Sequence, residues 1–194
     1  DEITMKILDA VQVKLTEGED ARLRAKGTKN LEAYLKLMQA RQYLQIYNRE
    51  NLALARQLTE KAIALDPQYS VAYATLCRVQ LGEAVLGVYK NTREALEQAV
   101  EFGQKAIALD DSNSYAHAAL SSVYAFLKEH DKALSEAEKA VSLDPNSATA
   151  YQALGNVLTW VGRPPEAIPF FKKSLRRSPI PIDTSAMTRR GLGY

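Results

Sequence analysis

One seven-residue phrase recurs along the chain and constrains its fold more than any other feature. It reads KAIALDP, KAIALDD and KAVSLDP at residues 61–67, 105–111 and 139–145, with a looser copy, KSLRRSP, at 173–179. Successive copies start 44, 34 and 34 residues apart. A fixed interval of this size is typical of arrays in which each helix–turn–helix unit buries its apolar side against its neighbours. We therefore expect an elongated array of helices and, with it, a binding role.

The residues inside each interval resemble the tetratricopeptide repeat. The clearest copy, residues 114–147, has His117, Leu120, Ser121 and Tyr124 in the slots of a first helix and Ala133, Ala140 and Pro145 in those of a second. This resemblance implies an all-α fold, a right-handed α-solenoid of antiparallel helix pairs. The repeat domain is expected to span residues 31–181, with units at 36–69, 70–113, 114–147 and 148–181.

The second unit differs from the others by about ten additional residues. They fall around residues 82–92, between its two helices. Gly87 and the stretch up to Thr92 predict a longer first helix, then a loop, then a second helix capped by Thr92. Insertions in repeat arrays map to loops on one face.

The two ends of the chain do not contain complete repeats. Residues 1–30 have apolar positions at helical spacing and predict a helical connector that caps the first unit. Residues 182–194 predict the start of a fifth unit that is cut off. Because the sequence opens on Asp1 without a Met, we expect it to be a fragment of a longer protein.

Two N-terminal stretches carry a more particular similarity. Residues 1–19 and 26–35 resemble the junction that precedes the tetratricopeptide region in bacterial class III adenylate/guanylate cyclase-like signalling proteins. The resemblance implies that this chain is the regulatory region of a multidomain signalling protein. Any metal-binding and nucleotide-binding residues of a cyclase would lie upstream, so no catalytic residue is carried over to this chain.

The composition argues against several classes of partner. There are 25 basic and 23 acidic residues, for a formal net charge of +2. This balance does not predict a nucleic-acid or anionic-membrane surface, and no apolar run is long enough to span a bilayer. We expect a cytoplasmic location, or a periplasmic one if the full-length protein has an upstream transmembrane helix.

The sequence offers no constellation for catalysis. His117 and His130 lack a second ligand at metal spacing, and Cys77 falls in a small-residue slot where burial would make its thiol inert. No glycine-rich phosphate loop is present. We therefore predict no catalytic, metal or cofactor site, and a fragment that is not an enzyme.

The first helix of each unit is expected to line a concave, mostly apolar groove. Its predicted contact residues are Leu44, Tyr47, Arg78, Leu81, Tyr115, Ser122, Phe126, Gln152, Asn156 and Trp160. The Lys/Asn/Arg clamp with which chaperone-binding tetratricopeptide domains hold a terminal carboxylate is missing, since only Asn156 matches it. The groove suits an amphipathic helix or an extended apolar segment.

Several alternatives remain open on the sequence alone. Arg78 either orients an acidic or C-terminal group of a partner or pairs with Glu83 within the chain, and Trp160 is either a core residue or a binding anchor. The groove accepts either a separate protein or the protein's own flanking segment. The function is then a protein-interaction scaffold or, alternatively, a self-association module that dimerises an upstream output domain.

Overall fold

The computed structural model describes residues 27–177, and the only regular secondary structure in this part of the chain is α-helix. Its eight helices are α3 (Leu31–Tyr43), α4 (Arg49–Leu65), α5 (Ser70–Val85), α6 (Thr92–Leu109), α7 (Ser114–Phe126), α8 (His130–Leu143), α9 (Ala148–Trp160) and α10 (Pro164–Arg177).

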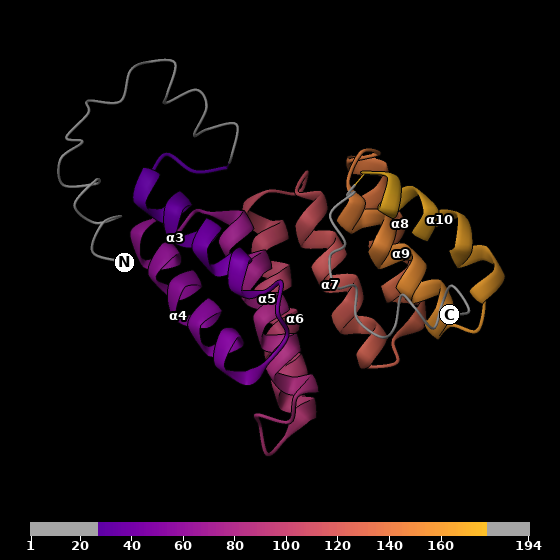
Figure 1. The fold of residues 1–194 in the computed structure, drawn as a ribbon, viewed down its shortest axis with the longest axis horizontal. Coiled ribbons are helices and arrows are strands. Elements are labelled where there is room, and N and C mark those ends of the chain that lie inside the picture. Colours follow the sequence, from indigo (N-terminus) through magenta and orange to yellow (C-terminus); the bar gives the residue numbers. More distant parts are fainter. Residues whose placement is uncertain (1–26, 178–194) are drawn as a thin grey trace.

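Consecutive helices form antiparallel pairs, and the pairs stack along one direction (Figure 1). The first helices of neighbouring pairs contact one another, α3 with α5, α5 with α7 and α7 with α9. These four helices therefore form one layer, and α4, α6, α8 and α10 form the other. The predicted all-α solenoid is confirmed for the described residues.

The recurring phrase owes its ending to a turn built by aspartate. Asp66, Asp110 and Asp144 each directly follow the last residue of a second helix. The side chain of each accepts a hydrogen bond from the backbone N–H two residues later, at 3.0, 3.0 and 2.9 Å. Such local bonds favour a turn over continued helix. The phrase therefore ends one helix and directs the chain into the next pair.

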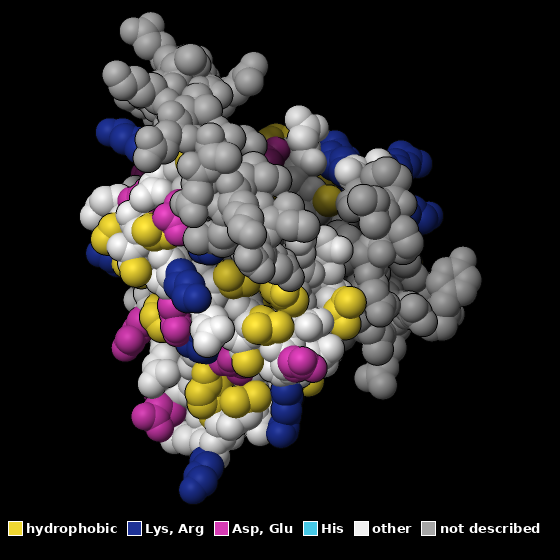
Figure 2. All heavy atoms as spheres, turned by 60° about the vertical axis from the view of Figure 1, so that its left-hand side comes forward, with side chains coloured by type: hydrophobic (Ala, Val, Ile, Leu, Met, Phe, Trp, Pro, Cys, Tyr) yellow, Lys and Arg dark blue, Asp and Glu magenta, His cyan; other side chains and the backbone are white. Residues whose placement is uncertain are grey.

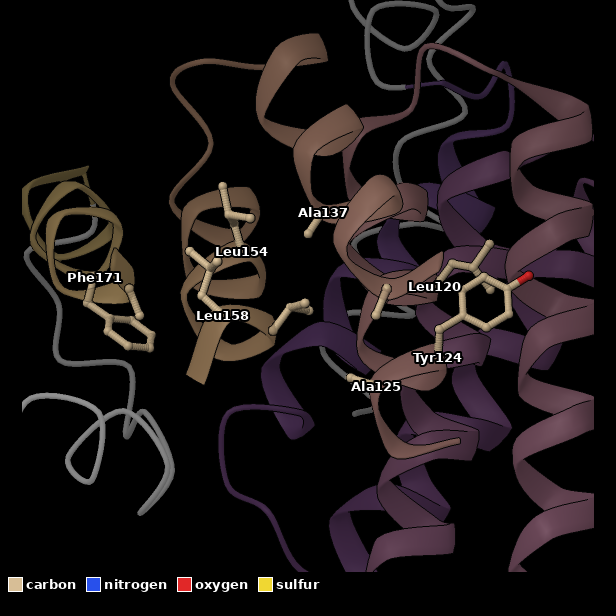
Figure 3. Close-up of a cluster of buried hydrophobic side chains, with 10 residues drawn as sticks. Leu120, Tyr124, Ala125, Ala137, Leu154, Leu158 and Phe171 are labelled. Atoms are coloured by element: carbon tan, nitrogen blue, oxygen red, sulfur yellow. The ribbon is translucent and has the colours of Figure 1, made fainter. Parts of the chain in front are cut away.

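Small residues let the helices of a pair approach closely. Ala133 and Ala140 of α8 are fully buried, as are their counterparts in α4 and α6, Ala55, Ala62, Ala99 and Ala106. At Gly155 in α9, an added Cβ would lie 2.6 Å from the ring of Phe171 in α10. Figure 3 shows Leu154 and Leu158 of α9 between Phe171 and the α7–α8 pair.

The second pair is lengthened mainly in its helices. α5 and α6 have 16 and 18 residues, whereas α7 and α8 have 13 and 14. The longer first helix and the loop are confirmed. The predicted cap at Thr92 is wrong, because Asn91 accepts the hydrogen bond from the N–H of Glu94, at 3.3 Å.

A polar network attaches this extension to the preceding pair. Arg56 of α4 donates to Glu83 of α5 at 2.5–3.0 Å, and Tyr89 of the α5–α6 loop donates to the same carboxylate at 2.5 Å. Gln80 joins Arg56 and also donates to Gln98 of α6, the latter bond at 3.1 Å. Because Glu83 is buried, these bonds replace the water that its carboxylate loses.

The first pair begins earlier than the first expected unit. α3 starts at Leu31, five residues before Lys36. Asn30 caps it by accepting from the N–H of Ala33 at 3.0 Å and donates to the carbonyl of Leu65 at 3.1 Å. The start of α3 is thus held to the end of α4. The connection between these two helices spans residues 44–48.

The predicted connector in residues 1–30 lies almost wholly outside the described residues, and the predicted fifth unit in 182–194 lies outside them entirely. Between residues 27 and 177, none of the helices has both the length and the apolar character that a bilayer crossing requires.

Candidate protein-binding surface

The layer formed by α3, α5, α7 and α9 carries most of the predicted contact residues. Tyr47, in the α3–α4 connection, is 49% exposed. The others with accessible side chains are half-buried: Arg78, Tyr115, Ser122, Phe126, Gln152, Asn156 and Trp160. Leu44 and Leu81 are only 8% and 7% exposed. These two leucines therefore support the surface from beneath and offer little area to a partner.

Arg78 is held against an aromatic ring from the next pair. Its Nη1 donates to Tyr115 Oη at 3.0 Å, and its guanidinium carbon lies 5.4 Å from the centre of the Tyr115 ring. Attraction to Tyr115 is the largest of the effects that raise the pKa of Arg78, so the guanidinium is charged at neutral pH. The intramolecular pair with Glu83 does not form, because Glu83 bonds to Arg56 and Tyr89.

A second arginine, which sequence reasoning missed, contacts the same ring. The guanidinium carbon of Arg41, in α3, lies 5.0 Å from the centre of the Tyr115 ring. Three successive first helices thus contribute Arg41, Arg78 and Tyr115 to one cluster, here called the Arg–Tyr cluster.

Tyr47 borders this cluster. Burial raises the pKa of Tyr47, while the charge of Arg78 acts in the opposite direction, which places its hydroxyl in the field of that guanidinium. Tyr47 packs over Gly82 of α5, where an added Cβ would lie 2.6 Å from the Tyr47 hydroxyl. Gly82 therefore makes room for this aromatic side chain.

A pair of aromatic rings lies at the other end of α7. Phe126 and Trp160 meet edge to face, with ring centres 4.9 Å apart and an interplanar angle of 73°. Trp160 also packs against the buried cluster shared by α7, α8, α9 and α10. Since the ring is half-buried, it contributes to the core and leaves part of its surface accessible.

Polar side chains on α9 complete the surface. Gln152 and Asn156 are half-buried, and within residues 27–177 neither side chain makes a hydrogen bond. Ser122 of α7 is satisfied internally, donating to the carbonyl of Ala118 at 3.1 Å. The two amides are thus available to an extended backbone laid along α9.

Cys77 and His117, two residues considered for chemistry from the sequence, both have a structural role. Burial raises the pKa of the Cys77 thiol to about 12, so the thiol stays protonated. His117 is buried, with its Nδ1 2.5 Å from Glu136 and its Nε2 3.2 Å from the carbonyl of Asp111. Across the described part of the chain, no three His, Cys, Asp or Glu side chains gather in a way that could hold a metal ion.

Charges are mixed on the side of the molecule that Figure 2 brings forward. Basic and acidic side chains alternate there, with hydrophobic side chains between them. A surface of this kind suits a protein partner better than a polyanion.

Comparison with known proteins identifies one repeat in the chain and one relative that matches part of it. Residues 114–147 match the tetratricopeptide repeat family. A Rhizobium meliloti (strain 1021) protein named "Putative adenylate cyclase 3" is 34% identical over 85 residues. The match covers 44% of this chain and only 14% of that protein.

Two solved structures show the same fold. TTC0263, a thermophilic tetratricopeptide protein of Thermus thermophilus, superposes with a TM-score of 0.50 at 22% identity, covering 84% of this chain and 100% of that chain. PilF of Pseudomonas aeruginosa gives a TM-score of 0.57 at 23% identity, covering 84% of this chain and 68% of that chain.

Stacked tetratricopeptide repeats are scaffolds for protein–protein interaction, and proteins of this fold are generally non-catalytic. The chain therefore contains a tetratricopeptide repeat at residues 114–147, and a solenoid of helix pairs surrounds it.

Proposed function

We propose that this chain is the regulatory tetratricopeptide region of a bacterial multidomain signalling protein of the nucleotidyl cyclase type. In this proposal the layer of α3, α5, α7 and α9 binds a protein segment and thereby controls an output domain elsewhere in the same protein. The chain itself supplies binding and no catalysis.

The observation that carries the binding role is the row of accessible side chains across this layer. Arg78, Tyr115, Phe126 and Trp160 come from α5, α7 and α9, and all four are half-buried. Aromatic and arginine side chains of this kind supply most of the binding energy in protein interfaces. The signalling context is supported by the 34% identity to the Rhizobium meliloti protein, together with the junction-like sequence at residues 1–35.

The test is a deletion in the full-length gene product. The intact protein and a variant lacking residues 36–194 are produced in the native host, and formation of cyclic AMP and cyclic GMP is followed across growth conditions. We expect the activity of the intact protein to vary between conditions and that of the truncated protein to stay at a constant basal level.

A double substitution on the binding surface makes the same test while the repeat domain stays in place. Arg78→Ala combined with Phe126→Ala in the full-length protein should reproduce the loss of regulation, whereas Arg93→Ala, at an exposed pair on α6, should not. The proposal fails if regulation survives the deletion, or if the full-length product forms neither cyclic nucleotide.

A second candidate function is self-association. Ile168 and Leu175 of α10, the last described helix, are 37% and 44% exposed. A second copy packed on α10 would cover them and bring two output domains together. Sedimentation of the full-length protein over a hundredfold concentration range should then show a dimer that Leu175→Glu dissociates; a monomer at every concentration excludes this role.

A further inference from the structure

We propose that Arg41, Arg78 and Tyr115 form a subsite for a carboxylate of the bound protein segment. This inference rests on the proposed binding function and adds the chemistry of the ligand. The carboxylate is either an Asp or Glu side chain or the C-terminal group, and the experiment below separates these two sources.

Charge is the first argument. Neither Arg41 nor Arg78 has an acidic partner within residues 27–177, although Arg56, Arg93 and Arg163 each pair with a glutamate. Arg78 is half-buried, so its charge has lost part of its water without gaining a counter-charge from that part of the chain. Two guanidinium groups around one ring therefore leave a positive charge for an anion to neutralise.

The unused hydrogen-bond donors give the second argument. Arg78 uses Nη1 toward Tyr115, and no other hydrogen bond of its guanidinium forms among the described residues. Tyr115 Oη accepts that bond, and its own proton is not donated within the same part of the chain. The guanidinium fork and the phenol can therefore donate together to the two oxygens of a carboxylate.

The Tyr115 ring holds both cations in place before the ligand arrives. Arg41 and Arg78 lie 5.0 and 5.4 Å from the ring centre, within the range of cation–π attraction. Restricting two long side chains in advance reduces the conformational entropy lost on binding.

The position of the cluster predicts the spacing of a recognition motif. Tyr115 and Phe126 lie near opposite ends of α7, eleven residues apart, which is roughly 16 Å along the axis. An extended segment covers that distance in about five residues. We therefore expect ligands with an acidic group about five residues from a large apolar side chain, the latter contacting Phe126 and Trp160.

Selection from a random library tests the inference and does not require the natural partner to be identified. A library of random twelve-residue peptides, displayed on phage with free C-termini, is selected on the wild-type protein, on Arg41→Gln/Arg78→Gln, and on the control Arg93→Gln, with folding checked by circular dichroism. We expect wild type and control to enrich peptides with an acidic group at the stated spacing. The double variant should retain the apolar preference and lose the acidic one.

Affinities of one enriched peptide then identify the source of the carboxylate. Replacing its Asp or Glu by the amide should weaken binding to wild type at least about tenfold, equal to about 1.4 kcal/mol, and should leave binding to the double variant unchanged. The same loss on amidating the C-terminus assigns the subsite to a terminal carboxylate instead.

The outcomes separate the two proposals. Enriched peptides whose binding needs neither an acidic side chain nor a free C-terminal carboxylate overturn the carboxylate subsite and leave the binding surface standing. A carboxylate requirement that survives in the double variant does the same. If no peptide is enriched on the wild-type protein, the binding surface itself is contradicted, and the subsite with it.

Discussion

His117 shows how a residue that could have been a ligand serves the fold. The hydrogen bond to Glu136 is the largest effect on its pKa and raises it above the ordinary value. A doubly protonated ring donates to Glu136 from Nδ1 and to the Asp111 carbonyl from Nε2. The histidine thereby links α7 to α8 and to the turn before α7.

The stability of the protein should therefore depend on pH through His117. Because the folded pKa is raised, the stabilisation is fully present below the unfolded value of about 6.5 and is lost as pH rises through the folded pKa. Chemical unfolding from pH 5 to 9 should show that His117→Gln lowers the free energy of unfolding most at acidic pH. The control is His130→Gln; an equal effect of His117→Gln at all pH values contradicts this account.

A second residue-scale prediction concerns the pair of Arg56 and Glu83. The Arg56 side chain is 23% exposed and that of Glu83 only 6%, so Arg56→Ala leaves a buried carboxylate bonded to Tyr89 alone. Breaking a fully buried pair costs about 3–5 kcal/mol, and we expect roughly 2–3 here because Arg56 keeps some solvent. Urea unfolding measures it.

Two further variants check that the cost arises from the buried charge. Arg56→Met with Glu83→Gln should recover most of the stability, because no charge then remains buried. Arg93→Ala, at a pair with 81% and 58% exposed side chains, should cost under about 1 kcal/mol. Equal costs for Arg56→Ala and Arg93→Ala would contradict the role given to burial.

At the scale of the element, the close contact of α9 with α10 depends on Gly155. Its missing Cβ leaves room for the Phe171 ring, which is 1% exposed. Gly155→Ala should destabilise the protein by about 1–3 kcal/mol through overpacking. Thermal unfolding should also show that Phe171→Leu partly rescues Gly155→Ala, although it is destabilising alone. Additive effects of the two substitutions would contradict direct contact.

The sequence predicted helix boundaries correctly where the same turn residue recurs in each repeat. It predicted them wrongly where a boundary depends on a contact outside the repeat. The aspartates at 66, 110 and 144 form the same turn each time, so their spacing indicates where second helices end. The start of α3 depends on Asn30, which bonds to Leu65 across 35 residues, and no local pattern reports such a contact. The cap of α6 was misplaced by one residue, since Asn91 and Thr92 are both good capping residues.

Part of the candidate surface was predictable from the sequence, because its residues follow the repeat pattern. Residues on α5, α7 and α9 follow the repeat, and the pattern identified Arg78, Tyr115, Phe126 and Trp160 in accessible positions. Leu44 and Leu81 were expected in the groove, but they are buried. Arg41 was missed because its contact with Tyr115 joins two helices that are far apart in the sequence, and the true partner of Glu83, Arg56, lies on a neighbouring pair.

At the scale of the whole molecule, the two layers of helices have different roles. α4, α6 and α8 each pack between two first helices and α10 packs against α9, whereas the first-helix layer carries Arg41, Arg78, Tyr115, Phe126 and Trp160. The helix packing lies mostly between neighbouring pairs, so a ligand that contacts several pairs at once would link them into one unit.

Hydrogen exchange tests this division of roles most directly. Amide exchange of the wild-type protein is measured by mass spectrometry with and without a peptide enriched on it. The account predicts that bound peptide slows exchange in α5, α7 and α9, and that Arg78→Ala/Phe126→Ala abolishes the protection while keeping the helical content. Protection confined to α4, α6, α8 and α10 would show that the protein binds the peptide on the other layer. Protection unchanged in that variant would show that Arg78 and Phe126 do not bind it.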